Sequence, residues 1–261
     1  MLGAGRMGRE IMRAIAANEE SLQLTGVWVR PDSDLLDRPM TEFAGPAANG
    51  VTASCDLPSV FEAADVAIDF SLPDAVPGIL EVAVKARKAL VCGVSGLDKD
   101  TLVALQSAAR TVPLFYDRNM SIGVALLRRM VEQSGRVLGS GFAAKISDLH
   151  HAEKRDAPSG TALMLGETLA EARGQDFDSV MRYDAEQPAV AQNSEEIVFD
   201  VRREGLHPGA HTVVLTGPNE NLSFSHTVTD RRVFAVGALR AAQWLHGRPP
   251  GLYSMQDLLS G

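Results

Sequence analysis

The pattern of hydrophobic and polar positions divides the chain into two parts with different periodicity. In the first part, short runs rich in valine, isoleucine and phenylalanine alternate with stretches of helical periodicity. The apolar runs cover 24–29, 64–71, 88–94 and 112–116, and the helical stretches cover 9–17, 75–87 and 99–109. Continuous apolar strands that alternate with helices predict βαβ units and a parallel sheet.

After Ser121 the pattern changes. A long helical stretch comes first, and strands with period-two alternation follow, which is typical of an open sheet with one covered face. The helical stretches cover 123–138 and 161–172, and the alternating strands cover 144–149, 195–203, 211–216 and 221–229. We expect the polar segment 173–194 to be a surface loop, and the last helix, at 235–246, to return to the first domain.

Composition and charge narrow the classes of function. The 261 residues are 45% hydrophobic, enough for a substantial core, and carry a net charge of −8 with a pI near 5.3. Binding of nucleic acid needs a basic face, so we expect no nucleic-acid partner. The sequence shows no apolar run near the roughly 18 residues of a membrane span, no signal peptide, and only Cys55 and Cys92. We therefore expect a cytoplasmic protein without a membrane partner.

The sequence GAGRMG at residues 3–8 has the G-x-G-x-x-G spacing of a dinucleotide-binding loop. Glycines there permit a tight turn and let a pyrophosphate approach the N–H groups of a helix N-terminus. A chance glycine turn is the alternative, and the βα alternation that follows argues against it. The residues expected to contact a nicotinamide cofactor here are Gly3, Gly5, Arg6, Met7 and Gly8.

Such a loop normally follows a strand, yet only Met1 and Leu2 precede Gly3. We expect about five further apolar residues upstream of Met1 in the full reading frame, paired within the sheet.

About 20 residues beyond the loop, such folds place an acid for the ribose hydroxyl of NAD or an arginine for the 2′-phosphate of NADP. This chain has Val29 where the acid is expected, and Arg30 follows it. A solvated arginine in a turn is the plain alternative. Otherwise Arg30 favours NADPH over NADH.

The stretch HHAEKRDAPSGTA at 150–162 is the densest cluster of reactive groups in the chain. We expect no metal site, because His150 and His151 are adjacent and point in different directions, and because Pro208-Gly209 prevents a helix through His207 and His211. A serine nucleophile lacks the G-x-S-x-G turn. A charged loop that caps a helix, with Asp156 and Ser159 accepting from helix amides, is a third interpretation.

The fourth interpretation is an acid/base and anion site. Ser159-Gly160-Thr161 opens the predicted helix at 161–172, so its free N–H groups can hold a carboxylate. His150 can exchange protons near neutral pH, and Lys154 adds a cation with three donors. Beside a nicotinamide, this combination suits a reductase that acts on an acid.

These residues resemble the dihydrodipicolinate reductase family, whose signature is E/D-x-HH-x-x-K-x-DAPSGTA. The resemblance extends through AIDFSLPDA at 67–75, VCGVSGL at 91–97, NMSIGV at 119–124 and HTVTDRRVFAVGALRAAQWL at 226–245. It implies an α/β fold, with a Rossmann-type dinucleotide-binding domain and a second α+β domain built on an open mixed sheet. We expect the first domain at 1–121, completed by 231–261, and a substrate-binding and oligomerisation domain at 122–230.

The resemblance also implies residue roles and a reaction. His150 and Lys154 correspond to the catalytic acid/base and its proton-donating partner. The substrate's carboxylates are expected to be held by His151, Ser159, Gly160, Thr161 and Arg231. Further cofactor contacts are expected from Gly93, Val94 and Ser95, and from Asp117, Arg118, Asn119 and Met120.

The implied reaction is the NAD(P)H-dependent reduction of 4-hydroxy-tetrahydrodipicolinate in diaminopimelate and lysine biosynthesis, by a homotetramer joined through the second domain's sheet. Three departures concern the cofactor: a glycine loop one residue shorter than in many members, Val29, and Gly-Val-Ser in place of Gly-Thr-Thr. Two rivals remain open, a related two-domain dehydrogenase acting on an amino acid such as aspartate, and a dinucleotide-binding regulator without turnover.

Overall fold

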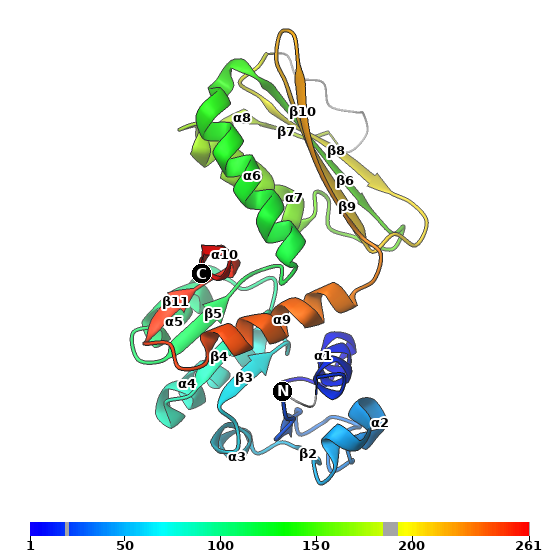
Figure 1. Cartoon of the computed structure of the whole chain (residues 1–261), viewed down its shortest axis with the longest axis vertical. Helices are drawn as coiled ribbons and strands as arrows, with labels where there is room; N and C mark the ends of the chain where they lie inside the picture. Colours follow the sequence, from blue (N-terminus) through cyan, green and yellow to red (C-terminus); the bar gives the residue numbers. More distant parts are fainter. Residues whose placement is uncertain (19–20, 185–192, 261) are drawn as a thin grey trace. The chain divides into compact units, whose positions relative to one another are not determined.

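The computed structural model describes residues 1–18, 21–184 and 193–260 (Figure 1). The chain divides into two compact units. Unit 1 comprises Met1–Ile122 and Arg232–Gly261, and unit 2 comprises Gly123–Arg231. The boundaries expected from the sequence lie one residue away from these, and the last long helix belongs to unit 1 as predicted.

Unit 1 is built on a parallel sheet. Its strands are β1 (Val27–Trp28), β2 (Ala53–Ser54), β3 (Val66–Asp69), β4 (Ala89–Cys92), β5 (Pro113–Tyr116) and β11 (Gly251–Tyr253). Strands β3, β4, β5 and β11 pair in that order, and β1 pairs with β2. Leu2 joins the two groups, because it forms parallel bridges to Trp28 on one side and to Asp69 on the other. This arrangement confirms the Rossmann-type sheet.

Helices cover both faces of this sheet. They are α1 (Arg6–Ala16), α2 (Thr41–Ala44), α3 (Leu57–Glu62), α4 (Val76–Ala86), α5 (Lys99–Ala108), α9 (Arg232–Leu245) and α10 (Met255–Ser260). Ile79 of α4 and Leu105 of α5 pack in one cluster with Leu114 of β5. The neighbouring residue Phe115 points to the opposite face, where its ring meets Trp244 of α9 edge-on at 6.1 Å between centroids.

Unit 2 is built on an open mixed sheet, as predicted. Its elements are α6 (Ile122–Leu138), β6 (Ala143–His150), α7 (Gly160–Ala172), α8 (Phe177–Val180), β7 (Met181–Arg182), β8 (Ile197–Arg203), β9 (Gly209–Thr216) and β10 (Asn221–Val228). The strand order is β10-β9-β6-β8-β7, with parallel β6/β8 and β7/β8 pairs and antiparallel β6/β9 and β9/β10 pairs. Helices α6 and α7 cover one face, where the apolar residues of the alternating strands form the core (Figure 1).

The prediction of a loop at 173–194 is wrong in part. Helix α8 and strand β7 lie in this segment, and β7 pairs with β8. One helical turn and a two-residue strand are too short to show a periodic pattern of hydrophobic and polar residues in the sequence. Residues 185–192 lie outside the described residues. The short elements β11 and α10, within residues 251–260, escaped prediction for the same reason.

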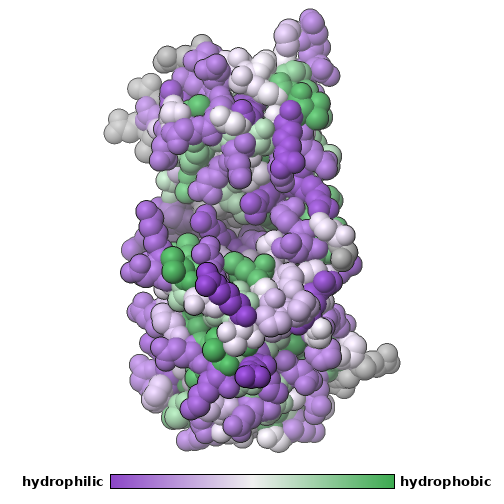
Figure 2. Space-filling model, turned by 90° about the vertical axis from the view of Figure 1, so that its left-hand side faces the viewer, coloured by the Kyte–Doolittle hydropathy of each residue, from purple (hydrophilic) through white to green (hydrophobic). Residues whose placement is uncertain are grey.

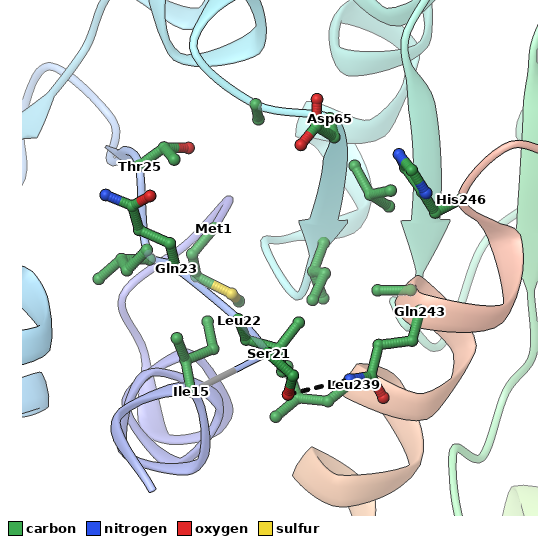
Figure 3. A pocket seen from close by; sticks show the side chains of 15 residues that line it. Met1, Ile15, Ser21, Leu22, Gln23, Thr25, Asp65, Leu239, Gln243 and His246 are labelled. Carbon is green, nitrogen blue, oxygen red and sulfur yellow. Dashed lines mark hydrogen bonds between the residues drawn. The ribbon is translucent and has the colours of Figure 1, made fainter. Parts of the chain in front are cut away.

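A cavity of about 540 Å³ lies in unit 1 beside Met1 (Figure 3). Residues 23–25, which lead into β1, and 64–66, which lead into β3, line it together with Leu239 and Gln243 of α9. The Met1 amino group donates to the Gly26 carbonyl at 2.9 Å, and burial lowers its pKa to about 5. The cavity therefore lies at the amino ends of the parallel strands. The residues expected upstream of Met1 stay a prediction.

The hydropathy of the surface and the composition of the helices bear on whether the chain could cross a membrane. The face drawn in Figure 2 is largely hydrophilic, with hydrophobic residues gathered in small groups. None of the helices in the described part of the chain combines the length and the apolar composition that a membrane crossing requires.

Candidate active site

The catalytic candidate His150 is the last residue of β6. Alternation along this strand places Ala144, Ile146, Asp148 and His150 on the face covered by helices, and all four are buried. The face therefore changes from apolar to ionisable side chains toward the carboxyl end of the strand. The prediction of His150 at a strand end is confirmed.

Asp148 is the centre of the polar cluster in unit 2 and is 1% exposed. Nδ1 of His150 lies 2.8 Å from its Oδ1, although the N–H axis is not aligned with that oxygen. Ser159 donates to the same carboxylate twice, from its amide at 2.8 Å and from its hydroxyl at 2.9 Å. Nη2 of Arg203 donates to Oδ2 at 3.0 Å, and Nε2 of His211 lies 3.3 Å from Oδ1.

These donors determine the charge of Asp148. Burial opposes its ionisation, but the contacts with His150, His211 and Ser159 hold the pKa of its carboxyl far below the ordinary value. A buried carboxylate is costly unless it is paired. Here cationic and hydrogen-bonding groups surround it, so the cluster keeps a negative charge next to the ring of His150.

The sequence analysis missed the roles of Asp148, Arg203 and His211. Their strand register brings them together, since Asp148 pairs with His211 of β9, and His150 pairs with Arg203 of β8. One signal was available. Asp148 stands two residues before His150, which places both on one face of a strand, and the family signature carries an acid at that position.

Lys154 lies on the loop after β6, as predicted. Its Nζ is 2.7 Å from both carboxylate oxygens of Asp156, and its side chain is 22% exposed. Asp156 therefore pairs with Lys154 instead of capping the helix. The amide of His151 donates to the His207 carbonyl at 2.9 Å, and the side chain of His151 is half-buried.

Helix α7 begins beside this cluster. Ser159 is its N-cap, since the Ser159 hydroxyl accepts from the Ala162 amide at 3.2 Å. Both donors of Ser159 are used by Asp148. Gly160 is exposed and Thr161 is half-buried. The first turn of α7 therefore offers the amides that suit an anion. Arg231, at the end of unit 2, is exposed.

Asp148, His150 and His211 also form the one group in the described part of the chain that has metal-ligand chemistry, with donor atoms within 4.8 Å of one another. Arg203 and Ser159 already satisfy the carboxylate of this group. A guanidinium at 3.0 Å from the carboxylate disfavours a metal cation there. The donor set fits a hydrogen-bonded network better than an ion.

The glycine loop in unit 1 has the geometry that a dinucleotide requires. Gly3 has φ +85°, Gly5 is the N-cap of α1 with open space where a Cβ would lie, and a Cβ on Gly8 would overlap the carbonyl oxygen of Gly3. The three glycines thus serve the turn, the approach of a phosphate, and the close packing of helix on loop. Arg6 and Met7 form the first turn of α1.

A pocket of about 520 Å³ opens at this loop. Gly3, Gly5, Arg30 and Arg38 are among the residues that line it. Val29, which stands where an acid was expected, also lines the pocket and is 4% exposed. The guanidinium of Arg30 is exposed and lies 3.6 Å from Asp32.

The other cofactor candidates lie after neighbouring strands of the same sheet. Gly93, Val94 and Ser95 follow β4, and the segment 117–120 follows β5. Carboxyl ends of parallel strands meet at one edge of a sheet, where α/β folds bind their ligands. Within the second segment, the side chains of Asp117 and Met120 are buried, whereas Arg118 is exposed and Asn119 is half-buried.

Comparison with known proteins identifies the family. Residues 1–120 match the model described as dihydrodipicolinate reductase, N-terminus, and residues 123–259 match the model described as dihydrodipicolinate reductase, C-terminus. The chain belongs to the dihydrodipicolinate reductase family.

Relatives agree with this identification over the full length. A 4-hydroxy-tetrahydrodipicolinate reductase of Alkalilimnicola ehrlichii is 40% identical over 98% of this chain and 96% of that protein. The corresponding reductase of Rhodopseudomonas palustris is 41% identical over 98% of this chain and 94% of that protein.

Solved structures agree on the fold. A dipicolinate-bound dihydrodipicolinate reductase from Paenisporosarcina sp. TG-14 matches with a TM-score of 0.77 at 20% identity, covering 98% of this chain and 97% of that one. A probable dehydrogenase from Thermotoga maritima matches with a TM-score of 0.59 at 13% identity, covering 98% and 91%. Members of the dihydrodipicolinate reductase family thus share this two-unit architecture with other dehydrogenases.

Proposed function

We propose that this protein is a 4-hydroxy-tetrahydrodipicolinate reductase, an oxidoreductase of diaminopimelate and lysine biosynthesis. The observation that carries this proposal is the match of both units to one reductase family, with relatives at about 40% identity over nearly the whole chain. The buried His150–Asp148 cluster beside the N-terminus of α7 supplies the chemistry that such a reaction needs.

The glycine loop and the pocket beside it fit a nicotinamide dinucleotide. Gly3 and Gly5 would face its pyrophosphate at the N-terminus of α1, and 93–95 and 117–120 would contact it farther along the same sheet edge. When bound, NAD(P)H would supply a hydride. The hydride acceptor would be C4 of the conjugated cyclic imine dicarboxylate that forms when 4-hydroxy-tetrahydrodipicolinate loses its 4-hydroxyl group as water.

The residues of unit 2 manage the charge of that substrate and its proton. The electron pair displaced by the hydride moves toward the ring nitrogen, and a proton completes the reduction there. His150, and Lys154 on the loop behind it, are the donors proposed for this proton. His151, Gly160, Thr161 and Arg231 would hold the two carboxylates, while Ser159 supports the first turn of α7 from below.

We propose NADPH as the preferred cofactor, although the family comparison supports NAD(P)H in general. Val29 removes the carboxylate that would accept from a ribose hydroxyl, and Arg30 lines the pocket with an exposed guanidinium. A guanidinium pairs with a phosphate through two parallel hydrogen bonds. Both features favour a 2′-phosphate.

We also propose a homotetramer that forms through the face of the unit 2 sheet opposite α6 and α7. On that face, β6 and β8 contribute an ion pair between Lys145 and Asp200. On β9 and β10 the paired residues of the face are uncharged and mostly small, including Ser223 opposite Val214 and Ser225 opposite Thr212. Such side chains permit close approach of a second sheet. Sedimentation of the purified protein would give a mass near four chains, and a monomer would contradict this assembly.

One assay tests the activity. Pyruvate and aspartate semialdehyde are condensed freshly by the preceding enzyme of the route, and the oxidation of NADPH is followed by absorbance. We expect oxidation that depends on the condensed product. Reduction of NADP⁺ with aspartate alone would favour the amino-acid dehydrogenase, and tight cofactor binding without any turnover would favour the regulator.

A further inference from the structure

The carboxylate of Asp148 links two parts of the unit 2 site that the proposed reaction uses separately. It contacts the ring of His150, and it accepts from both donors of Ser159 at the N-cap of α7. We propose that Asp148 is a positioning residue for the reduction: it fixes the ring of His150 and the first turn of α7 relative to each other. This inference rests on the proposed function.

The first link acts through one nitrogen of the imidazole. Nδ1 of His150 lies 2.8 Å from Oδ1 of Asp148. A carboxylate at Nδ1 keeps a proton on that nitrogen and leaves Nε2 as the atom that exchanges a proton with a ligand. Asp148 thus determines which of the two nitrogens faces the substrate.

The surroundings of the ring leave it little freedom. The ring of His211 meets it edge-on, with centroids 5.2 Å apart. A Cβ added to Gly209 would lie 2.9 Å from Nε2 of His150, and the φ of +155° at Gly209 disfavours side chains. The ring of His150 is therefore packed against both His211 and Gly209, with Nδ1 2.8 Å from the carboxylate.

The second link acts on the anion-binding end of α7. The Ser159 amide donates to Oδ2 of Asp148 at 2.8 Å, and its hydroxyl donates to Oδ1 at 2.9 Å. The same hydroxyl accepts from the Ala162 amide. Because Asp148 holds both donors of Ser159, it determines the position of the first turn of α7, whose Gly160 amide is the donor assigned to the anion.

A third link reaches Lys154. Nη2 of Arg203 donates to Asp148 at 3.0 Å and to the Asp156 carbonyl at 2.6 Å, and Asp156 binds Lys154. Asp148, Arg203 and Asp156 therefore form a continuous chain of contacts between the two proposed proton donors. Fixed geometry of this kind lowers the cost of orienting groups in the transition state.

The closing experiment compares three variants by steady-state kinetics and by cofactor binding. Asp148→Asn keeps the volume of the side chain but removes its charge, and Asp148→Glu keeps the charge, as family signatures allow. Glu196→Gln is the matched control, because Glu196 is also a buried acid of unit 2 paired with an arginine, Arg182, at 2.9 Å.

We expect kcat to fall by roughly 10²–10³ in Asp148→Asn, with NADPH binding unchanged and with a smaller rise in KM. Asp148→Glu should recover at least a tenth of the wild-type kcat, and Glu196→Gln should keep it. Equal kcat in Asp148→Asn and the wild-type protein would overturn the inference, and so would an equal loss of kcat in the Glu196→Gln control.

A second measurement needs neither activity nor a variant. Nitrogen-15 NMR of histidine-labelled wild-type protein reports which ring nitrogens carry protons, and we expect a proton on Nδ1 of His150. A bare Nδ1 would overturn the inference even if Asp148→Asn failed to fold. If the wild-type protein shows no turnover but Nδ1 is protonated, the proposed function is contradicted. The contact between Asp148 and Nδ1 of His150 is then still supported.

Discussion

Two buried aspartates, one in each unit, stand near the carboxyl ends of parallel strands and differ in charge. Asp69 ends β3 and is fully buried, with one hydrogen bond from the Ser71 amide at 2.8 Å. Its Oδ2 has no hydrogen-bond partner among the described residues. Burial raises the pKa of Asp69 to about 6. Asp148 is equally buried, yet its donors hold its pKa far below the ordinary value.

The difference shows that burial alone does not determine the state of a carboxyl group. The number and charge of the donors that face it decide whether it stays ionised. Asp148 is surrounded by two histidines, a serine and an arginine, whereas one oxygen of Asp69 has no donor in the described part of unit 1. Of these two aspartates, the one held in the charged form belongs to the proposed proton-transfer site. In unit 1, by contrast, the charged group proposed to recognise the cofactor is Arg30, whose guanidinium is exposed to solvent.

The comparison is tested most strongly at His150. His150→Gln keeps a polar side chain but cannot exchange protons, so turnover should fall by roughly 10²- to 10⁴-fold. His151→Gln is the adjacent control, and it should weaken substrate binding more than turnover. Steady-state kinetics with NADPH measure both. Near-normal turnover in His150→Gln would contradict the proposal that the charged Asp148 serves a proton donor at His150.

Lys154 tests how far the charged network extends. Lys154→Ala removes a cation and a donor, so kcat should fall and KM should rise, each by roughly tenfold. Lys154→Arg keeps the cation with a different donor geometry and should restore KM more than kcat. Cofactor affinity, measured by fluorescence titration, should stay constant in both. Loss of cofactor binding in either variant would contradict the assignment of cofactor binding to unit 1 alone.

Asp69 tests the opposite case through stability. Its pKa is 3.8 in the unfolded chain and about 6 when folded, so the folded state binds more protons between these values. The contribution of Asp69 to stability should therefore fall as the pH rises from about 4 to 6, by at most about 1.4 kcal/mol per pH unit, and stay level above that range. Asp69→Asn should lack this slope. Urea unfolding of both proteins at several pH values provides the comparison, and parallel curves would contradict it.

Arg30 should show the smallest effect because its guanidinium is exposed. Arg30→Ala should raise the KM for NADPH by roughly three- to tenfold and leave the KM for NADH nearly unchanged. Arg110→Ala, at an exposed arginine beyond α5, is a surface control. Equal losses with both cofactors would assign Arg30 to a group that the two cofactors share.

Periodicity predicted the long helices and the strands of unit 2 because each is long enough to show a period, and continuous apolar runs predicted β3, β4 and β5. The ends were less accurate: the run at 24–29 forms only the short strand Val27–Trp28. Helix α3 and the region of α2 were missed, because four to six residues cannot display a stripe. The order of strands in unit 2 depends on pairing between distant segments, which local patterns do not encode.

The site was predictable as far as it lies in one contiguous stretch. His150, Lys154 and the start of α7 come from a single motif, and the glycines from another. The contributions of Arg203 and His211 come from other strands and depend on register, as does the burial of Asp148 between them. Asp156 was expected to cap a helix, but its carboxylate lies 2.7 Å from Lys154, a stronger partner than a backbone amide.

The division of the chain has a consequence for synthesis on the ribosome. Unit 1 uses both ends of the chain, since α9 packs on its sheet and β11 pairs with β5. Unit 2 is continuous and is complete once Arg231 has emerged. Unit 2, which is inserted between the two segments of unit 1, can therefore fold before unit 1 is complete. The edge of β5 stays unpaired until β11 has been synthesised. Nascent chains in which Arg231 has left the ribosome but residues 232–261 have not should resist protease within the described strands of unit 2 and remain cleavable in unit 1.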